Sequence, residues 1–208
     1  MRILGIDEAG RGCVFGDLVV AGFIWDHEDQ TPLTEAGATD SKKLSAKRRV
    51  SARAKLELLG QWDVRCITPA QIDAGNLNTL EELVIADLVR TWKPDLVIVD
   101  ALGHPSGLGK VLARLQAQVA PLNPTWCIEP KADLNHPACG AASIFAKTDR
   151  DAALHELIED WGVLGSGYPS DPKTKAWLAE WNTTRKPWPS FVRTRWGTVR
   201  ALAQQGLA

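Results

Sequence analysis

Two short apolar runs in this chain end in carboxylates, and these carboxylates are the residues best suited to chemistry. The run at residues 3–6 is followed by Asp7 and Glu8, and the run at residues 96–99 is followed by Asp100. If both runs are parallel neighbouring strands, their carboxylates meet at the carboxyl edge of the sheet, where open α/β sheets bind ligands. Clustered carboxylates repel one another, and a hard divalent cation is the usual resolution. The alternative is that each aspartate only caps a strand–loop turn.

Ordered sequence blocks along the chain favour the first interpretation. They are D-E-A-G-R-G at residues 7–12, D-S-K-K-L-S at 40–45, N-L-N at 76–78 with Glu81 behind it, V-I-V-D at 97–100, E-P-K-A-D at 129–133, A-A-S-I at 141–144, A-K at 146–147, R-D at 150–151 and G-S-G-Y-P-S-D-P at 165–172. In this order the blocks resemble ribonuclease HII, the type 2 ribonucleases H. The last block is similar to the archaeal and eukaryotic branch of that family. The resemblance extends from residue 3 to about residue 196.

This resemblance implies a metal-dependent endoribonuclease. Such an enzyme hydrolyses the RNA strand of RNA–DNA hybrids and incises duplex DNA 5′ of an embedded ribonucleotide, leaving 3′-hydroxyl and 5′-phosphate ends. The catalytic and metal-binding carboxylates that the resemblance implies are Asp7, Glu8, Asp100 and Asp133. They would hold two Mg²⁺ or Mn²⁺ ions, of which one activates a water and the other stabilises the leaving 3′ oxygen.

The resemblance also implies residues that contact the nucleic acid. The backbone of Gly10, Arg11 and Gly12, together with Tyr168, would sense the 2′-hydroxyl that marks a ribonucleotide. Glycines suit this role because the main chain can approach the sugar closely where no Cβ intervenes. Tyr168 is the only tyrosine of the chain, so no other residue of this type can replace it. Further substrate-binding positions implied by the resemblance are Ser41, Lys42, Lys43 and Asn78.

The charges of the chain are balanced in number but unevenly distributed. There are 24 Lys and Arg residues against 25 Asp and Glu residues, yet residues 40–55 and residues 173–208 each carry seven basic side chains and one acidic side chain. Two basic islands on an acidic body suggest a polyanion held at two places, although a basic run is more often a solvated face. With the resemblance, we expect RNA–DNA hybrids and ribonucleotide-containing DNA duplexes as partners, with phosphate contacts fixing their register.

The elements that must position these residues form one α/β pattern. We expect strands at residues 3–6, 18–25, 64–67, 96–99 and 125–128, helices at about 45–59, 78–92, 108–119 and 137–161, and an acidic surface loop at 26–40. This order predicts a mixed sheet flanked by helices, in agreement with the ribonuclease H-like fold that the resemblance implies.

The last forty residues read as a helical appendage. We therefore expect a catalytic domain at residues 1–165 and a helical extension at residues 166–208 that clasps the substrate. The extension is rich in tryptophan, and large aromatic side chains in such a segment usually pack it onto the body rather than stack on bases. The tryptophans concerned are Trp177, Trp181, Trp188 and Trp196.

Three positions depart from the family pattern near the expected site. Cys13 and Asp17 stand where the family usually has prolines, and we expect the loss of these prolines to loosen the loop after the G-R-G turn. His136 stands where a tyrosine is common. None of the three is one of the four carboxylates or Tyr168, so we expect activity, with rate and metal preference left open.

Several classes of protein are not indicated by the sequence. The longest apolar run, residues 18–25, is far shorter than the roughly 20 residues of a membrane helix, and Asp7 and Glu8 interrupt any signal-peptide core. The four cysteines are scattered without a C-x-x-C pair or a histidine at metal-ligand spacing, which argues for reduced thiols and against structural zinc. We expect a cytoplasmic monomer without a membrane partner. Residues 201–208 show no obvious clamp-binding peptide, so a sliding-clamp partner stays unknown.

Two other functions are compatible with parts of the pattern. A catalytically silent hybrid-binding protein would explain the altered loop at Cys13 and Asp17, although the intact carboxylates argue against it. A nuclease or resolvase of the same broad fold could act on plain DNA. That enzyme would cut an all-DNA duplex as readily as a duplex that contains a ribonucleotide.

Overall fold

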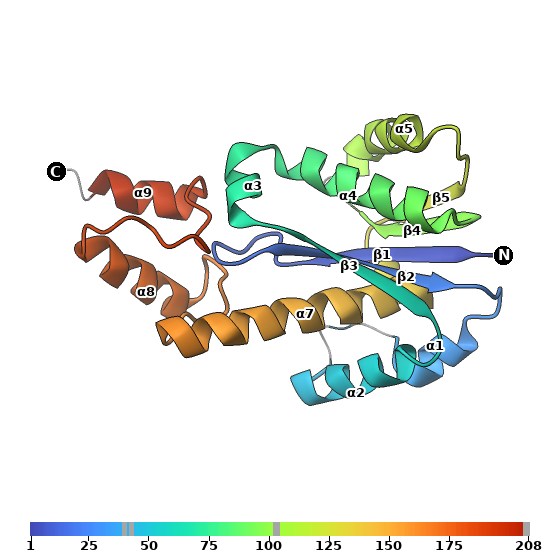
Figure 1. Ribbon diagram of the computed structural model, residues 1–208, viewed down its shortest axis with the longest axis horizontal. Helices are drawn as coiled ribbons and strands as arrows, with labels where there is room; N and C mark the ends of the chain where they lie inside the picture. The colour runs from blue at the N-terminus through green and yellow to red at the C-terminus, as the bar shows by residue number, and fades with distance from the viewer. Residues whose placement is uncertain (39–40, 42–43, 102–104, 206–208) are drawn as a thin grey trace.

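The chain folds around one five-stranded sheet with helices on both faces (Figure 1). The computed structural model describes residues 1–38, 41, 44–101 and 105–205. The strands are β1 (Ile3–Ala9), β2 (Leu18–Trp25), β3 (Gln61–Ile67), β4 (Leu96–Asp100) and β5 (Thr125–Glu129). Their spatial order is β3-β2-β1-β4-β5, with antiparallel pairing on the β2 side of β1 and parallel pairing on the β4 side. The predicted mixed sheet is confirmed.

All four predicted helices form, and several short ones accompany them. The helices are α1 (Thr31–Ala36), α2 (Ala46–Leu56), α3 (Pro69–Ala74), α4 (Leu77–Trp92), α5 (Leu108–Val119), α6 (Ala132–Asn135), α7 (Pro137–Trp161), α8 (Pro172–Thr183) and α9 (Gly197–Gln205), with a 3₁₀ turn at Pro105–Gly107. The predicted cap Ser45 accepts a hydrogen bond from the Arg48 backbone nitrogen. No helix in the described part of the chain combines the length and the apolar character needed to cross a bilayer.

One loop prediction was wrong. The segment predicted as an acidic surface loop at residues 26–40 contains α1 within its described part, and this helix buries Leu33 and Ala36. A six-residue helix spans fewer than two turns, so it leaves no repeating apolar pattern in the sequence. The short helices α3 and α6 escaped prediction for the same reason.

Alternate residues of β1 face two different helical layers. Ile3 packs in a core cluster with residues of α7, α1 and α2, whereas Leu4 and Ile6 pack with residues of α4 and α5. Because successive strand residues point to opposite faces, Asp7 continues the α7 face and Glu8 continues the α4 face. The sheet therefore presents a carboxylate on each side of its edge.

The long helix α7 crosses β1 at very short range. A Cβ atom on Gly5 would lie 2.2 Å from the carbonyl carbon of Ala138, so only glycine fits at this position. The first turns of α7 are lined with small buried residues, and Pro137 opens the helix as predicted. This close packing fixes α7 beside the carboxyl half of β1, where Asp7 lies.

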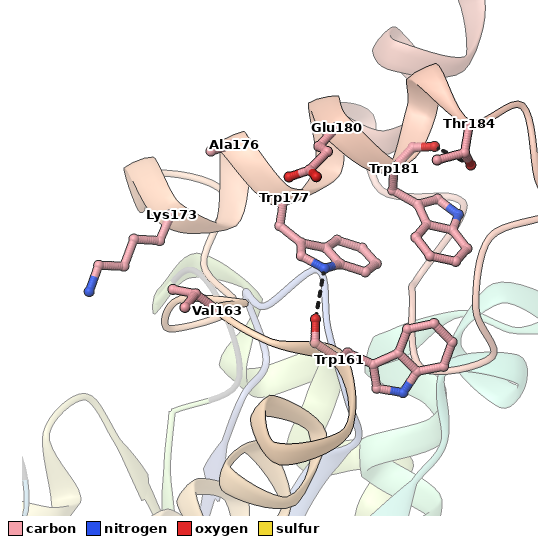
Figure 2. Close-up of a pocket in the computed structure, with 8 residues that line it drawn as sticks. All are labelled: Trp161, Val163, Lys173, Ala176, Trp177, Glu180, Trp181 and Thr184. Atoms are coloured by element: carbon pink, nitrogen blue, oxygen red, sulfur yellow. Dashed lines mark hydrogen bonds between the residues drawn. The ribbon is translucent and has the colours of Figure 1, made fainter.

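The C-terminal helices pack onto the body through a third apolar cluster, which we call the aromatic cluster. It contains Val14, Phe15, Leu164, Leu178, Phe191, Val192 and Val199, with Leu157, Ile158, Trp177, Trp188, Trp196 and Leu202 at its margin. The Trp177 ring contacts Phe15 of the β1–β2 loop edge-on, with centroids 5.2 Å apart. Trp161, Trp177 and Trp181 also line a surface cavity of about 530 Å³ (Figure 2). The prediction that these tryptophans pack the extension onto the body is confirmed for Trp177, Trp188 and Trp196, which belong to the margin of this cluster, and for Trp181, whose ring contacts Trp161 of α7 edge-on.

Candidate active site

The carboxyl ends of β1 and β4 bring two predicted site residues together. The two strands are parallel neighbours, and Ile6 pairs with Val99 at the end of their register. Asp7 and Asp100 are the next residue of each strand, as the sequence pattern predicted. The negative charge of Asp100 reaches Asp7, which is only 6% exposed, and contributes to the raised pKa of Asp7.

The carboxylates at this edge have perturbed proton affinities because they are buried among like charges. Burial raises the pKa of Asp7 well above its usual range, and the neighbouring charges of Glu8 and Asp100 raise it further. Burial also raises the pKa of Glu8 to about 7, assisted by the charges of Glu81 and Asp100 and opposed by Arg11. A concentration of carboxylates that resist ionisation is typical of a site that receives a cation.

Asp133 reaches the same edge from α6. Its side chain is 3% exposed, and the backbone nitrogen of the preceding residue, Ala132, donates to Asp100 Oδ1 at 3.1 Å. The thiol of Cys139 on α7 lies close enough to three of the carboxylates for their charges to affect its pKa. Burial raises its pKa well above the usual range, and the charges of Asp7, Asp100 and Asp133 add to that shift. Segments far apart in the sequence thus bring the predicted carboxylates to one end of the sheet.

The carboxylate oxygens are near one another without being closely clustered. Within the described residues, no three of these carboxylates bring one oxygen each to within 4.8 Å of one another. Asp7 Oδ1 instead accepts from the Glu8 backbone nitrogen at 2.8 Å, and Asp100 Oδ1 accepts from the Ala101 nitrogen at 3.0 Å. Repulsion between like charges disfavours a closer approach of these oxygens. A donor set made only of carboxylate oxygens fits a hard divalent cation such as Mg²⁺ or Mn²⁺.

A cavity of about 410 Å³ joins two of these carboxylates to the predicted substrate-reading residues. Its lining comprises Asp7, Glu8, Ala9, Gly10, Arg11, Gly12, Ser41, Arg49, Ser143, Lys147 and Tyr168. Gly10 has a φ of +87°, and a Cβ there would lie 2.9 Å from the Asp17 carbonyl oxygen, so the turn needs glycine. A Cβ at Gly12 would lie 3.5 Å from the Tyr168 ring. The G-R-G turn and Tyr168 are therefore in near contact.

Tyr168 is held at the cavity wall with part of its surface open. Its side chain is 39% exposed, and the Arg150 guanidinium lies 5.5 Å from the ring centroid. Arg150 also donates to the Cys13 sulfur at 3.0 Å and to the Ser166 carbonyl oxygen, which fixes the loops on both sides of the ring. Burial, followed by the nearby Cys13, raises the pKa of Tyr168. The phenol accordingly keeps its proton at neutral pH and can donate a hydrogen bond.

The other predicted substrate contacts that the structure describes lie in different environments. Asn78, in the first turn of α4, accepts a hydrogen bond from Arg11 of the G-R-G turn. Ser41 is buried, and its hydroxyl lies 2.8 Å from the Ser143 hydroxyl rather than facing solvent. Lys42 and Lys43 lie outside the described residues. Arg11 also lies 3.0 Å from the buried carboxylate of Glu81, whose pKa burial raises to about 7.

Sequence reasoning did not assign three polar residues that line this cavity. Ser143 and Lys147 are four residues apart on α7 and lie within the A-A-S-I and A-K blocks, which was the available signal. Ser143 hydrogen-bonds to Asp7 and lowers its pKa, against the larger effect of burial. Arg49 donates to the Ser41 carbonyl oxygen at 3.1 Å and to Asp151 at 2.9 Å.

Arg193 fastens the loop that follows the G-R-G turn. Its side chain is fully buried and donates to the Gly16 carbonyl oxygen at 2.9 Å and to the Arg11 carbonyl oxygen at 3.1 Å. Burial lowers the pKa of this guanidinium to about 10. We predicted a looser loop because Cys13 and Asp17 replace prolines. In the structure this loop is tied down at several points by the C-terminal segment.

Some cations of the two basic islands form ion pairs, and others are exposed. In the first island Arg49 pairs with Asp151, and Arg53 pairs with Glu57 and Asp149. Those two cations hold α2 on the body. The exposed cations of the described residues in the two islands are Lys47, Arg48, Lys55, Lys173, Lys175, Arg185, Lys186, Arg195 and Arg200.

Comparisons with known proteins agree with this site. The profile of the family described as Ribonuclease HII matches residues 4–199. The Ribonuclease HII of Aeropyrum pernix is 40% identical over 206 residues, which cover 96% of this chain and 89% of that protein. The Ribonuclease HII of Archaeoglobus fulgidus is 38% identical and is covered to 97%, with 98% of this chain aligned.

Solved structures show the same architecture. Ribonuclease H2 from Pyrococcus horikoshii superposes with a TM-score of 0.90 at 33% identity, covering 100% of this chain and 99% of that one. RNase HII from Archaeoglobus fulgidus, solved as a complex with PCNA, superposes with a TM-score of 0.85 at 36% identity, covering 96% of both chains. A Bst-RNase HIII structure shares the fold, with a TM-score of 0.77 at 17% identity, covering 99% of this chain and 70% of that one. The expected ribonuclease H-like fold is confirmed.

Proposed function

Because this chain belongs to the ribonuclease HII family of metal-dependent hydrolases, we propose that it incises duplex DNA 5′ of an embedded ribonucleotide and hydrolyses the RNA strand of RNA–DNA hybrids. The products carry 3′-hydroxyl and 5′-phosphate ends. The observation that carries the proposal is the single cavity lined by Asp7, Glu8, the G-R-G turn and Tyr168. Carboxylates suited to hydrolysis and groups suited to recognising a 2′-hydroxyl therefore line the same cavity.

Asp7, Glu8, Asp100 and Asp133 are the residues that would hold divalent ions in this proposal. Support comes from their donor atoms, which are all oxygens, and from the raised pKa values of Asp7 and Glu8. Two ions of Mg²⁺ or Mn²⁺ suit four carboxylates better than one, because a single dication leaves two negative charges uncompensated. When bound, the ions supply a water of lowered pKa and stabilise the leaving 3′ oxygen.

The protein's own groups would orient the carboxylates and recognise the substrate. The backbone nitrogen atoms of Glu8, Ala101 and Ala132 donate to the carboxylates and set their orientation. We propose that the Tyr168 hydroxyl and the backbone of Gly10 and Gly12 contact the 2′-hydroxyl. A 2′-deoxy sugar would leave these polar groups unpaired, which is the basis of selection.

The nucleic acid is proposed to lie across both basic islands. Ser41, Lys42, Lys43 and Asn78 are the further proposed substrate contacts. Residues 166–208 are proposed as an extension that clasps the duplex, and the exposed Lys173, Lys175, Arg185 and Lys186 support this role. Binding to such cations releases counterions, so affinity should fall steeply as salt rises. An affinity unchanged between low and moderate salt would contradict it.

The partners proposed for this chain are nucleic acids, and the protein is proposed to act as a monomer. The related Archaeoglobus fulgidus RNase HII was solved as a complex with PCNA. We propose a sliding clamp as a further partner on that likeness alone. Size-exclusion chromatography of the protein, alone and mixed with a clamp, tests both statements.

An incision assay separates the proposal from its rivals. The parent protein with Mg²⁺ is expected to cut a duplex that holds one ribonucleotide and an RNA–DNA hybrid, and to leave an all-DNA duplex intact. Asp100→Asn, which keeps the shape of the side chain, is the matched inactive control. Failure of the folded parent protein to cut any substrate would favour the silent hybrid-binding protein. Equal cutting of the all-DNA duplex would favour a general nuclease.

A further inference from the structure

Three side chains with metal-ligating atoms meet beside β5, away from the cavity described above. Cys127 and Glu129 belong to β5, and His136 is the residue before the first turn of α7. One ligand atom from each lies within 4.8 Å of the other two, and all three residues are half-buried. Among the described residues they form the one group of three or more such side chains that meets this distance.

The distances within this cluster match those of a tetrahedral zinc site. Typical bonds are about 2.3 Å for Zn–S and about 2.0–2.2 Å for Zn–N and Zn–O, so tetrahedral angles place sulfur and nitrogen about 3.6 Å apart and nitrogen and oxygen about 3.4 Å apart. The Cys127 sulfur lies 3.6 Å from His136 Nε2. His136 Nε2 lies 3.2 Å from Glu129 Oε1. These two separations are hydrogen-bond contacts in the structure, and each lies within about 0.2 Å of the separation that a tetrahedral zinc site requires.

The backbone holds these ligands in place. Cys127 and Glu129 are two apart on a strand, so their side chains leave the same face of the sheet. His136 is fixed between α6 and α7, because its backbone nitrogen donates to the Ala132 carbonyl oxygen at 2.9 Å. Asn135 Nδ2 donates to Glu129 Oε1 at 2.8 Å and orients that carboxylate from outside the cluster. Such outer hydrogen bonds are typical of metal ligands.

We propose that Cys127, Glu129 and His136 bind a divalent cation of the zinc class at a site separate from the carboxylate edge. A thiolate and an imidazole favour Zn²⁺ over Mg²⁺, whereas the carboxylate edge has the opposite preference. On binding, the Cys127 S–H proton is released to solvent and the sulfur forms the bond to the metal. Three protein ligands leave a fourth position for water.

This site has a consequence for the segment that carries Asp133. The cation joins β5 to the junction of α6 and α7, and α6 lies between the ligands in the sequence. Glu129 is also connected to the end of β4, because its carbonyl oxygen accepts from the Ala101 nitrogen at 3.0 Å. The bound cation should therefore resist local opening of the loop that carries Asp133 and should raise the melting temperature of the protein.

The sequence argued against structural zinc because it shows neither a C-x-x-C pair nor a histidine at a customary spacing. The fold supplies another arrangement, in which two strand positions meet a helix cap seven residues beyond the nearer of them. This proposal depends on residues outside the proposed catalytic set, so it can fail without affecting the proposed nuclease activity.

Cobalt is a suitable probe because thiolate-bound Co²⁺ absorbs light through sulfur-to-metal charge transfer, which carboxylate-bound Co²⁺ does not. The parent protein, titrated with Co²⁺ under reducing conditions, is expected to develop this band with one equivalent and to lose it when Zn²⁺ is added. Cys127→Ser should abolish the band. His136→Tyr should weaken Co²⁺ binding at least about tenfold, since loss of even an outer hydrogen bond costs that much.

Two controls make the result specific. Cys66→Ser, which removes an exposed cysteine on β3, should keep the band. Asp100→Asn, which alters the carboxylate edge, should keep it as well. The proposal is overturned if the parent shows no charge-transfer band, if Cys127→Ser retains it, or if Asp100→Asn removes it. Should Cys127→Ser not fold, an unchanged Co²⁺ affinity in His136→Tyr overturns the proposal on its own.

Discussion

The carboxylate edge and the aromatic cluster are held together by opposite physical means. At the carboxylate edge, Asp7 and Glu8 are buried near like charges, and their raised pKa values show that ionisation there is unfavourable. In the aromatic cluster, Phe15, Trp177 and Phe191 make edge-on and tilted ring contacts with centroids 5.2–5.7 Å apart. Ring contacts of this kind stabilise a fold beyond the effect of burial alone.

This difference indicates that chemistry and stability are assigned to separate parts of the fold. The carboxylate edge contributes charge that the metal-free protein holds at a cost, as functional sites often do. The aromatic cluster and Arg193 hold the G-R-G turn in place from the other side. Substitutions at the carboxylate edge should therefore lower activity without lowering stability, whereas substitutions in the aromatic cluster or at Arg193 should lower stability.

The largest effect is expected for Asp7→Asn. The variant loses a proposed metal ligand, so the rate of ribonucleotide incision should fall at least about 100-fold, beyond what outer-shell changes cause. It also loses a buried charge among like charges, so the metal-free variant should melt at a higher temperature than the parent above neutral pH. Incision rates and thermal melting in a chelator measure the two effects. Asp26→Asn, at an exposed pair with Arg2, should change neither.

The next effect is expected for Arg193→Met. The Gly16 and Arg11 carbonyl oxygens lose their buried donor, which should cost about 2 kcal/mol of stability. For a chain of this size that is a fall in Tm of about 4–8 °C, measurable by calorimetry. Arg195→Met, at an exposed neighbour, is the matched control and should change Tm little. An unchanged Tm in Arg193→Met would show that the C-terminal segment does not secure the loop.

Tyr168→Phe should change selectivity without changing stability. The ring and its contact with Arg150 remain, while the hydroxyl is lost. Loss of one hydrogen bond to the substrate should lower the preference for a ribonucleotide over deoxyribonucleotide sites up to about tenfold. Incision rates on matched duplexes measure this preference, and filter binding measures affinity. If binding and preference fall together, Tyr168 does not act in selection.

The smallest effect is expected for Asp171→Asn, at the start of α8. Hydrogen bonds from the Ser166 side chain and from the backbone nitrogen atoms of Ser166 and Lys173 lower the pKa of Asp171 to about 2. A lowered pKa means that its stabilising effect is full above the unfolded value of 3.8 and is lost as pH falls towards 2. The variant should melt slightly below the parent near neutral pH, with the difference shrinking in acid. A difference that grows in acid would contradict this assignment.

The parts of the site that lie on long elements were predictable from the sequence. The strands before Asp7 and Asp100 carry uninterrupted apolar runs, and parallel pairing then brings their ends together. Asp133 lies on a four-residue helix that has no periodic signal, so only the family resemblance pointed to it. The sequence pattern predicts a helix or strand only where the element is long enough for its apolar spacing to repeat.

Residues that act through tertiary contacts were not predictable in this way. Arg193 reads as one more cation of a basic island, yet it is fully buried and bonded to a loop almost 180 residues away. Cys127 and His136 meet because a strand and a helix cap return to the same place. Neither arrangement has a fixed spacing, so the sequence alone could not reveal them.

The helix α7 connects the two compared regions as one rigid rod. Its first turns pack on β1 beside the carboxylate edge, and Leu157 and Ile158 near its end pack against the aromatic cluster (Figure 1). Each residue of an α-helix advances the azimuth by about 100°. A single-residue insertion in the middle of α7 would therefore swing α8 and α9 about a quarter of a turn around the rod. The orientation of the C-terminal helices relative to the carboxylate edge therefore depends on the number of residues in α7.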